Sequence, residues 1–159
     1  MYENLKKLND TINWYQSLLN YKSELMIMPI KEGKFSVKEI IAHLYKWDEF
    51  LLNIGIPSIL ENGRLQFPNI DEYNSNAAKE SMNIEFASVI ELAIKRREAV
   101  VKSFLENESF SEKEISINGH TQKPNSNENY TFYYLLEDFS EHDKHHIRQV
   151  EEFLHVNNT

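Results

Sequence analysis

Two histidines that lie four residues apart near the C-terminus restrict how this chain folds. The segment from about Tyr130 to Val156 has the spacing of one helix, on which His142 and His146 lie about 40° apart. Apolar residues share the arc of the two imidazoles: Leu135, Phe139, Val150 and Phe153. Buried imidazole nitrogens lose their hydrogen bonds to water, so such a pair needs partners inside the protein. An i, i+4 histidine pair that faces a core is therefore a candidate metal site.

A third histidine lies in the apolar face of another predicted helix. Ser36 and Glu39 fit a capping box that begins this helix, and we expect it to continue towards Pro57 or Leu60. On its helical wheel, His43 lies among apolar residues: Ile40, Trp47, Phe50 and Ile54. One buried histidine is usually a hydrogen-bonded core residue, whereas three on two facing helices favour a shared metal ion.

Two further long helices are predicted from apolar spacing. The first spans residues 2 to about 24, with the apolar stripe Leu5, Leu8, Ile12, Tyr15 and Leu19. The other spans about 84 to 106, with inward residues Phe86, Val89, Ile90, Ala93, Val100, Val101 and Phe104. The connections between helices two and three and between three and four are long. These features predict an all-α fold, a four-helix bundle formed as a single domain over 1–159.

The long connections have some expected structure of their own. A short helix is predicted over 71–79. The polar stretch 107–129 is predicted to be an extended loop in which Ile115 and Ile117 form a brief strand. A loop of this length is either a simple connector or a lid over a site.

Charge and composition exclude several function classes. The formal net charge of −8 and the absence of basic clusters oppose nucleic-acid binding, with Lys95-Arg96-Arg97 as a single basic patch on a mixed helix. No stretch approaches the length of a membrane span, and the polar N-terminus lacks a signal-peptide core. Together with the absence of cysteine, these features predict a cytoplasmic protein that does not bind membranes. The chain also has no thiol of its own.

Three imidazoles leave at least one coordination position for water or substrate, which is typical of catalytic rather than structural sites. Imidazole ligands suit Zn²⁺, Ni²⁺, Co²⁺ or Fe²⁺. Ligating histidines usually donate their other N–H to an acceptor, and the helical wheels offer Glu39, Asp138 and Gln149 as candidates.

The remaining three histidines have simpler interpretations. His145 lies at the edge of the apolar arc. His155 is placed to interact with the C-terminal end of the helix dipole. His120 lies in the long polar loop and is expected to be exposed.

Two segments resemble the DinB/YfiT-like superfamily of small metal-binding four-helix proteins: residues 35–48 (FSVKEIIAHLYKWD) and 141–149 (EHDKHHIRQ). The resemblance extends over nearly the whole chain in the order of its helices. It implies that His43, His142 and His146 together bind a divalent metal ion, often zinc or nickel, and that the protein forms a homodimer. Phe35 stands where many members have Trp, a difference expected to affect packing alone.

The resemblance implies an enzyme, and two reactions are compatible with it. Members related to bacillithiol and mycothiol S-transferases activate a small thiol, so we expect transfer of a low-molecular-weight thiol onto an electrophile in detoxification. Because the chain has no cysteine, that thiol must be a cosubstrate. One alternative is metal-dependent hydrolysis with activated water and Asp138 or Glu141 as the base. The other is a non-catalytic metal-binding protein of the stress response.

Overall fold

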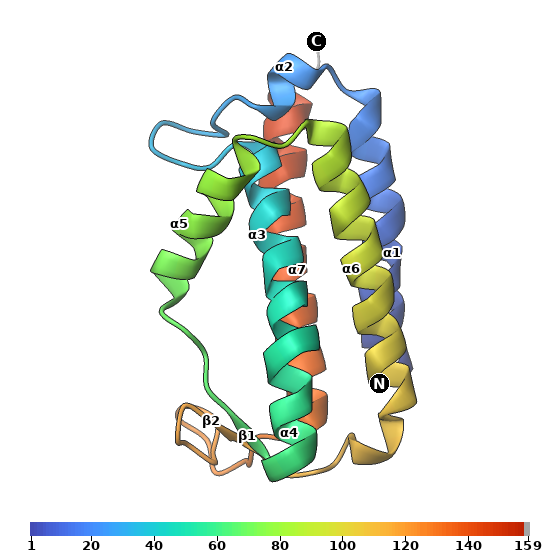
Figure 1. The fold of residues 1–159 in the computed structure, drawn as a ribbon, viewed down its shortest axis with the longest axis vertical. Coiled ribbons are helices and arrows are strands. Elements are labelled where there is room, and N and C mark those ends of the chain that lie inside the picture. The colour runs from blue at the N-terminus through green and yellow to red at the C-terminus, as the bar shows by residue number, and fades with distance from the viewer. Residues whose placement is uncertain (158–159) are drawn as a thin grey trace.

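The computed structural model describes residues 1–157, and four long helices form a bundle (Figure 1). They are α1 (Tyr2–Ser17), α3 (Val37–Phe50), α6 (Phe86–Glu106) and α7 (Phe132–Asn157). Helix α6 contacts both α1 and α3, and α7 closes the bundle against the same two helices. The predicted all-α four-helix bundle is therefore confirmed. Among the described residues, no helix combines the length and the apolarity that a membrane crossing requires.

Short elements join the four helices. They are a 3₁₀ turn (Leu18–Asn20), α2 (Ser23–Met26), a π-helical turn (Leu51–Gly55), α4 (Ile56–Asn62), β1 (Arg64–Leu65), α5 (Ile70–Ser81), a second 3₁₀ turn (Glu108–Phe110) and β2 (Ser116–Ile117). The two long connections meet where β1 and β2 pair in parallel, with Leu65 opposite Ile117. The brief strand predicted in the 107–129 stretch is thus present, and it ties one connection to the other at one end of the bundle (Figure 1).

Helix α1 is shorter than predicted because it ends at Ser17 in a 3₁₀ turn. The tighter turn changes the phase of the apolar stripe, so Leu18 is fully buried while Leu19 is 49% exposed. Earlier in the helix, Ile12 belongs to the predicted stripe but is only half-buried, whereas its neighbour Thr11 is buried. A buried threonine is tolerated here because its hydroxyl takes part in a hydrogen-bond network described below.

The prediction for the second long helix is correct at its start and less accurate at its end. The capping box at Ser36 and Glu39 is present as expected. At the other end the helical run passes Pro57 and continues to Asn62, where Gly63 ends it in the left-handed conformation with φ of 71°. The intervening π-helical turn shifts the helix phase, so Ile54, predicted to face inward, is 53% exposed.

Helix α5 is held against the outside of α3. The hydroxyl of Tyr73 donates to the backbone carbonyl of Lys46 at 2.7 Å, and Nε1 of Trp47 donates to Oδ1 of Asn74 at 2.8 Å. The Lys46 ammonium also pairs with Glu80 at 2.8 Å. These contacts fix α5 beside α3 (Figure 1).

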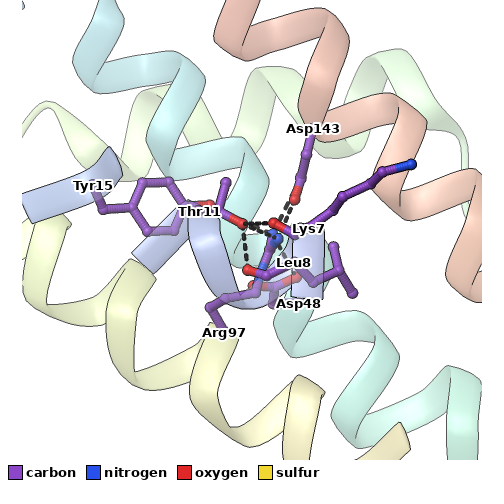
Figure 2. A network of polar contacts seen from close by, with 7 residues as sticks. All are labelled: Lys7, Leu8, Thr11, Tyr15, Asp48, Arg97 and Asp143. Atoms are coloured by element: carbon purple, nitrogen blue, oxygen red, sulfur yellow. Dashed lines mark hydrogen bonds and ion pairs between the residues drawn. The ribbon is translucent and has the colours of Figure 1, made fainter. Parts of the chain in front are cut away.

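A buried arginine connects all four long helices (Figure 2). Arg97 of α6 is 1% exposed, although the sequence grouped it with Lys95 and Arg96 in one basic patch. Its guanidinium donates to both carboxylate oxygens of Asp48 in α3, at 2.8 and 3.2 Å, and to both of Asp143 in α7. It also donates to the Thr11 hydroxyl at 3.1 Å and lies 3.5 Å from the Tyr15 hydroxyl, both in α1. The patch interpretation was wrong because Arg97 follows the apolar spacing of α6, between Ala93 and Val100.

The network holds two carboxylates around one guanidinium in a space without solvent. Burial raises the pKa of Asp48 to about 6, and the nearby Asp143 adds to the rise, whereas Arg97 opposes it. A buried charge of this kind is tolerated only while its partner remains, because the lost hydration is replaced by the ion pair.

Removing the guanidinium should therefore destabilise the protein strongly. Arg97→Leu leaves two buried carboxylates without their shared cation, and we expect it to lower the free energy of unfolding by about 3–5 kcal/mol. Arg96→Leu is the matched control, because Arg96 pairs with Glu49 at 3.0 Å in a partly exposed position. That pair should contribute about 1 kcal/mol or less. Urea denaturation measures both variants, and equal losses would contradict a structural role for the buried network.

Candidate metal centre

The structure brings His43, His142 and His146 together between two facing helices. His43 projects from α3, and the other two from successive turns of α7. One ring nitrogen from each lies within 4.8 Å of the other two. The Nε2 atoms of His43 and His146 are 3.1 Å apart. All three ring pairs meet edge to face, with centroids 4.4 to 5.5 Å apart. The nitrogens therefore converge on one point between α3 and α7.

One of the predicted hydrogen-bond partners contacts this group. Nδ1 of His146 lies 2.9 Å from Oε1 of Gln149, which orients the ring so that Nε2 faces His43. The Glu39 carboxylate does not take part, because it accepts the backbone N–H of Ser36 at 2.7 Å in the capping box. Nδ1 of His43 is buried and has no hydrogen-bond partner of good geometry among the described residues, although the backbone of Glu39, one turn earlier, acts on the ring as a hydrogen-bonding group that raises its pKa.

This hydrogen-bonding pattern leaves a conflict that a cation resolves. Because Gln149 accepts from Nδ1–H of His146, Nε2 of His146 carries a lone pair that points at His43. If the proton of His43 is on Nδ1, the lone pairs of the two Nε2 atoms face each other. If the proton is on Nε2, Nδ1 is a buried acceptor without a donor. Two nitrogens bound to one tetrahedral Zn²⁺ lie roughly 3.3 Å apart, close to the observed separation. The residues present therefore fit a metal ion.

The protonation state of the three histidines also suits a metal. Burial lowers the pKa of His43 well below its usual value, and His146 and His142 lower it further. Burial likewise lowers the pKa of His142, against Asp143 and Asp138, which raise it. Burial lowers the pKa of His146 to about 4, and repulsion from His142 contributes to this decrease. All three imidazoles are therefore neutral at pH 7, which is the form that binds metal ions.

A cleft of about 380 Å³ opens beside His142. It is lined by Trp47, Phe67, Ile70, Asp138, Phe139, Glu141 and His142. Both acidic residues predicted as candidate bases thus lie in the same cleft as one of the histidines. The 107–129 loop contributes no residue to it. A second depression, of about 420 Å³, reaches Gln149 but none of the three histidines.

The other histidines lie outside the group. His145 is exposed, and its ring centroid is 5.1 Å from that of His146. His120 and His155 are exposed as well. None of them joins the set of converging nitrogens in the described part of the chain.

Asp143 is a residue of this region that the sequence interpretation missed. It is 4% exposed and lies between two of the histidines in the sequence, yet it faces Arg97. A signal was available, because one stripe of α7 continues through it at helical spacing: Leu136, Ser140, Asp143, Ile147, Val150 and Leu154. A carboxylate in the middle of such a stripe indicates a buried cation opposite, which here is Arg97.

The architecture and the histidine group together define a four-helix bundle with a group of three histidines able to hold a metal ion. A solved structure with this fold is YfiT from Bacillus subtilis, described as a probable metal-dependent hydrolase with an unusual four-helix bundle topology. The two structures superpose with a TM-score of 0.73 over 96% of this chain and 85% of YfiT, at 14% sequence identity. The fold that the sequence resemblance implied is thus confirmed. No family model matches the sequence, and no curated protein matches it significantly.

The lowered pKa of His146 predicts how the metal-free protein responds to acid. Between pH 6.5 and about 4 the unfolded state protonates this histidine while the folded state does not, so stability falls as the pH falls. In chelator, the free energy of unfolding should drop more between pH 7 and 5 for the wild type than for His146→Gln. The Asp48 contribution is common to both proteins and cancels in this comparison. Urea denaturation at the two pH values measures it, and identical drops would show that His146 is not held neutral by the fold.

Proposed function

We propose that the chain is a metal-dependent enzyme in which His43, His142 and His146 hold a divalent metal ion, Zn²⁺ or Ni²⁺. The observation that carries this proposal is the convergence of three neutral imidazoles beside an apolar cleft. A divalent ion held there lowers the pKa of a water or thiol that joins it, which supplies a nucleophile at neutral pH. The protein positions the substrate in the cleft and moves the proton.

Hydrolysis is the first candidate reaction, because YfiT, which shares the fold, is described as a probable metal-dependent hydrolase and a proton acceptor lines the cleft of this chain. Asp138 lies one turn before His142 on α7 and at the rim of the same cleft. Partial burial raises the pKa of the Asp138 carboxyl, while His142 opposes the rise. A carboxylate with a raised pKa is a better base, so we assign to Asp138 the proton released by the attacking water. Glu141 lies 3.3 Å from the Lys144 ammonium, and this ion pair makes it the weaker candidate.

Thiol transfer is the second candidate. Its support is the apolar character of the cleft, in which Trp47 and Phe139 are almost fully buried, because a thiolate is weakly hydrated and tolerates such surroundings. The chain has no cysteine, so a low-molecular-weight thiol would enter as cosubstrate and attack an electrophile in the cleft. Asp138 would then accept the proton of the thiol. A homodimer and a cytoplasmic location remain expectations from the resemblance and the composition.

Metal binding is the first point to test. Untagged protein should bind about one Zn²⁺ per chain, measured by competition with a chromophoric chelator. His43→Gln removes one of three ligands and should weaken binding at least about 100-fold. His145→Gln is the matched control, because it changes a neighbouring exposed histidine outside the group, and it should retain wild-type affinity. Wild-type affinity in His43→Gln would refute the assigned ligand set.

The reaction is distinguished by its thiol requirement. A panel of activated esters and electrophilic dyes is assayed with and without bacillithiol, glutathione or cysteine, and in the presence of chelator. Hydrolysis predicts turnover without thiol that chelator abolishes, and strict thiol dependence would establish transfer instead. Asp138→Asn should lower kcat about 100-fold with unchanged zinc affinity, whereas Glu141→Gln should have little effect. Zinc binding without turnover in either assay would indicate the non-catalytic alternative.

A further inference from the structure

The cleft beside His142 has an unusual combination of apolar walls and negative charge. Four of its lining residues are apolar, and three of these are aromatic: Trp47, Phe67 and Phe139, with Ile70 as the fourth. Its two charged lining residues are both acidic, Asp138 and Glu141. No lysine or arginine is among the described residues that line it. The lining is thus suited to an apolar molecule and opposed to an anion.

The aromatic wall is held in place before any ligand binds. The Trp47 and Phe67 rings meet edge to face with centroids 5.8 Å apart, and Phe67 stacks on Phe50 at 5.5 Å. The indole N–H of Trp47 is already bonded to Asn74, so its ring presents apolar surface to the cleft. The backbone N–H of Phe67 donates to Oδ1 of Asn118 at 2.9 Å, which fixes the segment that carries this ring. Rings fixed in this way bind a flat group at small cost in conformational entropy.

The polar rim determines the charge that such a flat group can carry. Asp138 and Glu141 lie on consecutive turns of α7, and neither is buried. The Lys144 ammonium pairs with Glu141 at 3.3 Å and does not line the cleft. Asp138 has no ion pair with any described residue. In the metal-free protein the mouth of the cleft is therefore negative, and Ile70, which is 55% exposed, adds apolar surface at the same rim.

We propose that this cleft binds a small aromatic molecule with a positively charged substituent, an aryl-alkyl ammonium. The ring would occupy the space between Trp47, Phe67 and Phe139, and the ammonium would face Asp138 and Glu141. A volume of about 380 Å³ fits a molecule of this size. The inference rests on the proposed function in taking the cleft as the substrate site, and it adds the substrate class.

Three matched probes test the preference: benzylammonium, benzyl alcohol and phenylacetate. They share a ring and differ in charge. Binding is followed by tryptophan fluorescence in a Trp14→Phe variant, which leaves Trp47 as the reporter in the cleft. In chelator, where side chains alone determine binding, benzylammonium should bind about tenfold more tightly than phenylacetate, with benzyl alcohol between them. Equal or tighter binding of phenylacetate, or no binding of any probe, would overturn the proposal.

Substitutions show whether the named residues cause the preference. Asp138→Asn should reduce the ratio between benzylammonium and phenylacetate to about threefold or less, because one of the two carboxylates loses its charge. Asp10→Asn, which removes an exposed carboxylate of α1 far along the chain, is the control and should leave the ratio unchanged. Phe67→Ala should weaken all three probes alike. An unchanged ratio in Asp138→Asn would overturn the assignment of the rim.

These titrations require neither metal nor turnover, so the two proposals fail separately. Probe binding with the expected preference but no zinc binding would refute the proposed function alone. Zinc binding without probe binding would refute the substrate class alone.

Discussion

The bidentate ion pairs of Arg97 with Asp48 and Asp143 fix the geometry on which the candidate site depends. Asp48 lies five residues after His43 on α3, and Asp143 directly follows His142 on α7. Because one planar guanidinium binds both carboxylates, it sets the separation and rotation of the two helices that carry the histidines (Figure 2). When both carboxylates are ionised, the network has one negative charge in excess. Asp143 acts on His142 through this charge, which favours a cation at the histidine group.

Three faces of helix α7 carry residues with three different roles. One face directs His142 and His146 at α3, a second directs Asp143 at Arg97, and a third presents Asp138 to the cleft. These faces place neutral imidazoles, a buried carboxylate and a partly hydrated carboxylate within a few turns of one helix. Burial lowers the pKa values of the histidines, which makes them neutral ligands at pH 7, and it raises the pKa of Asp138, which makes that carboxylate a stronger base. Metal ligation, structural support and proton transfer can therefore be assigned to different residues of the same element.

The spacing of apolar residues predicted the four-helix bundle and the proximity of the three histidines, because both follow from helix geometry. The Ser36 capping box was equally readable, since it depends on residues within one turn. Arg97 and Asp143 were missed because a hydrophobic pattern treats charged residues as exposed, whereas these two satisfy each other in the core. Ile54 was misplaced because the π-helical turn changes the phase of the helix. Phe67 lies in a connection without periodicity, so its place in the cleft wall depends on tertiary contacts with Asn118.

We propose that three imidazoles from two helices hold one metal ion beside an apolar cleft. X-ray absorption spectroscopy of the protein loaded with one equivalent of zinc tests it most directly, because imidazole ligands produce a characteristic multiple-scattering pattern. The account predicts three imidazole nitrogens at about 2.0 Å with one further light-atom ligand, and the loss of one imidazole in His43→Gln. Two or fewer imidazoles in the wild type, or a spectrum unchanged in His43→Gln, would contradict it.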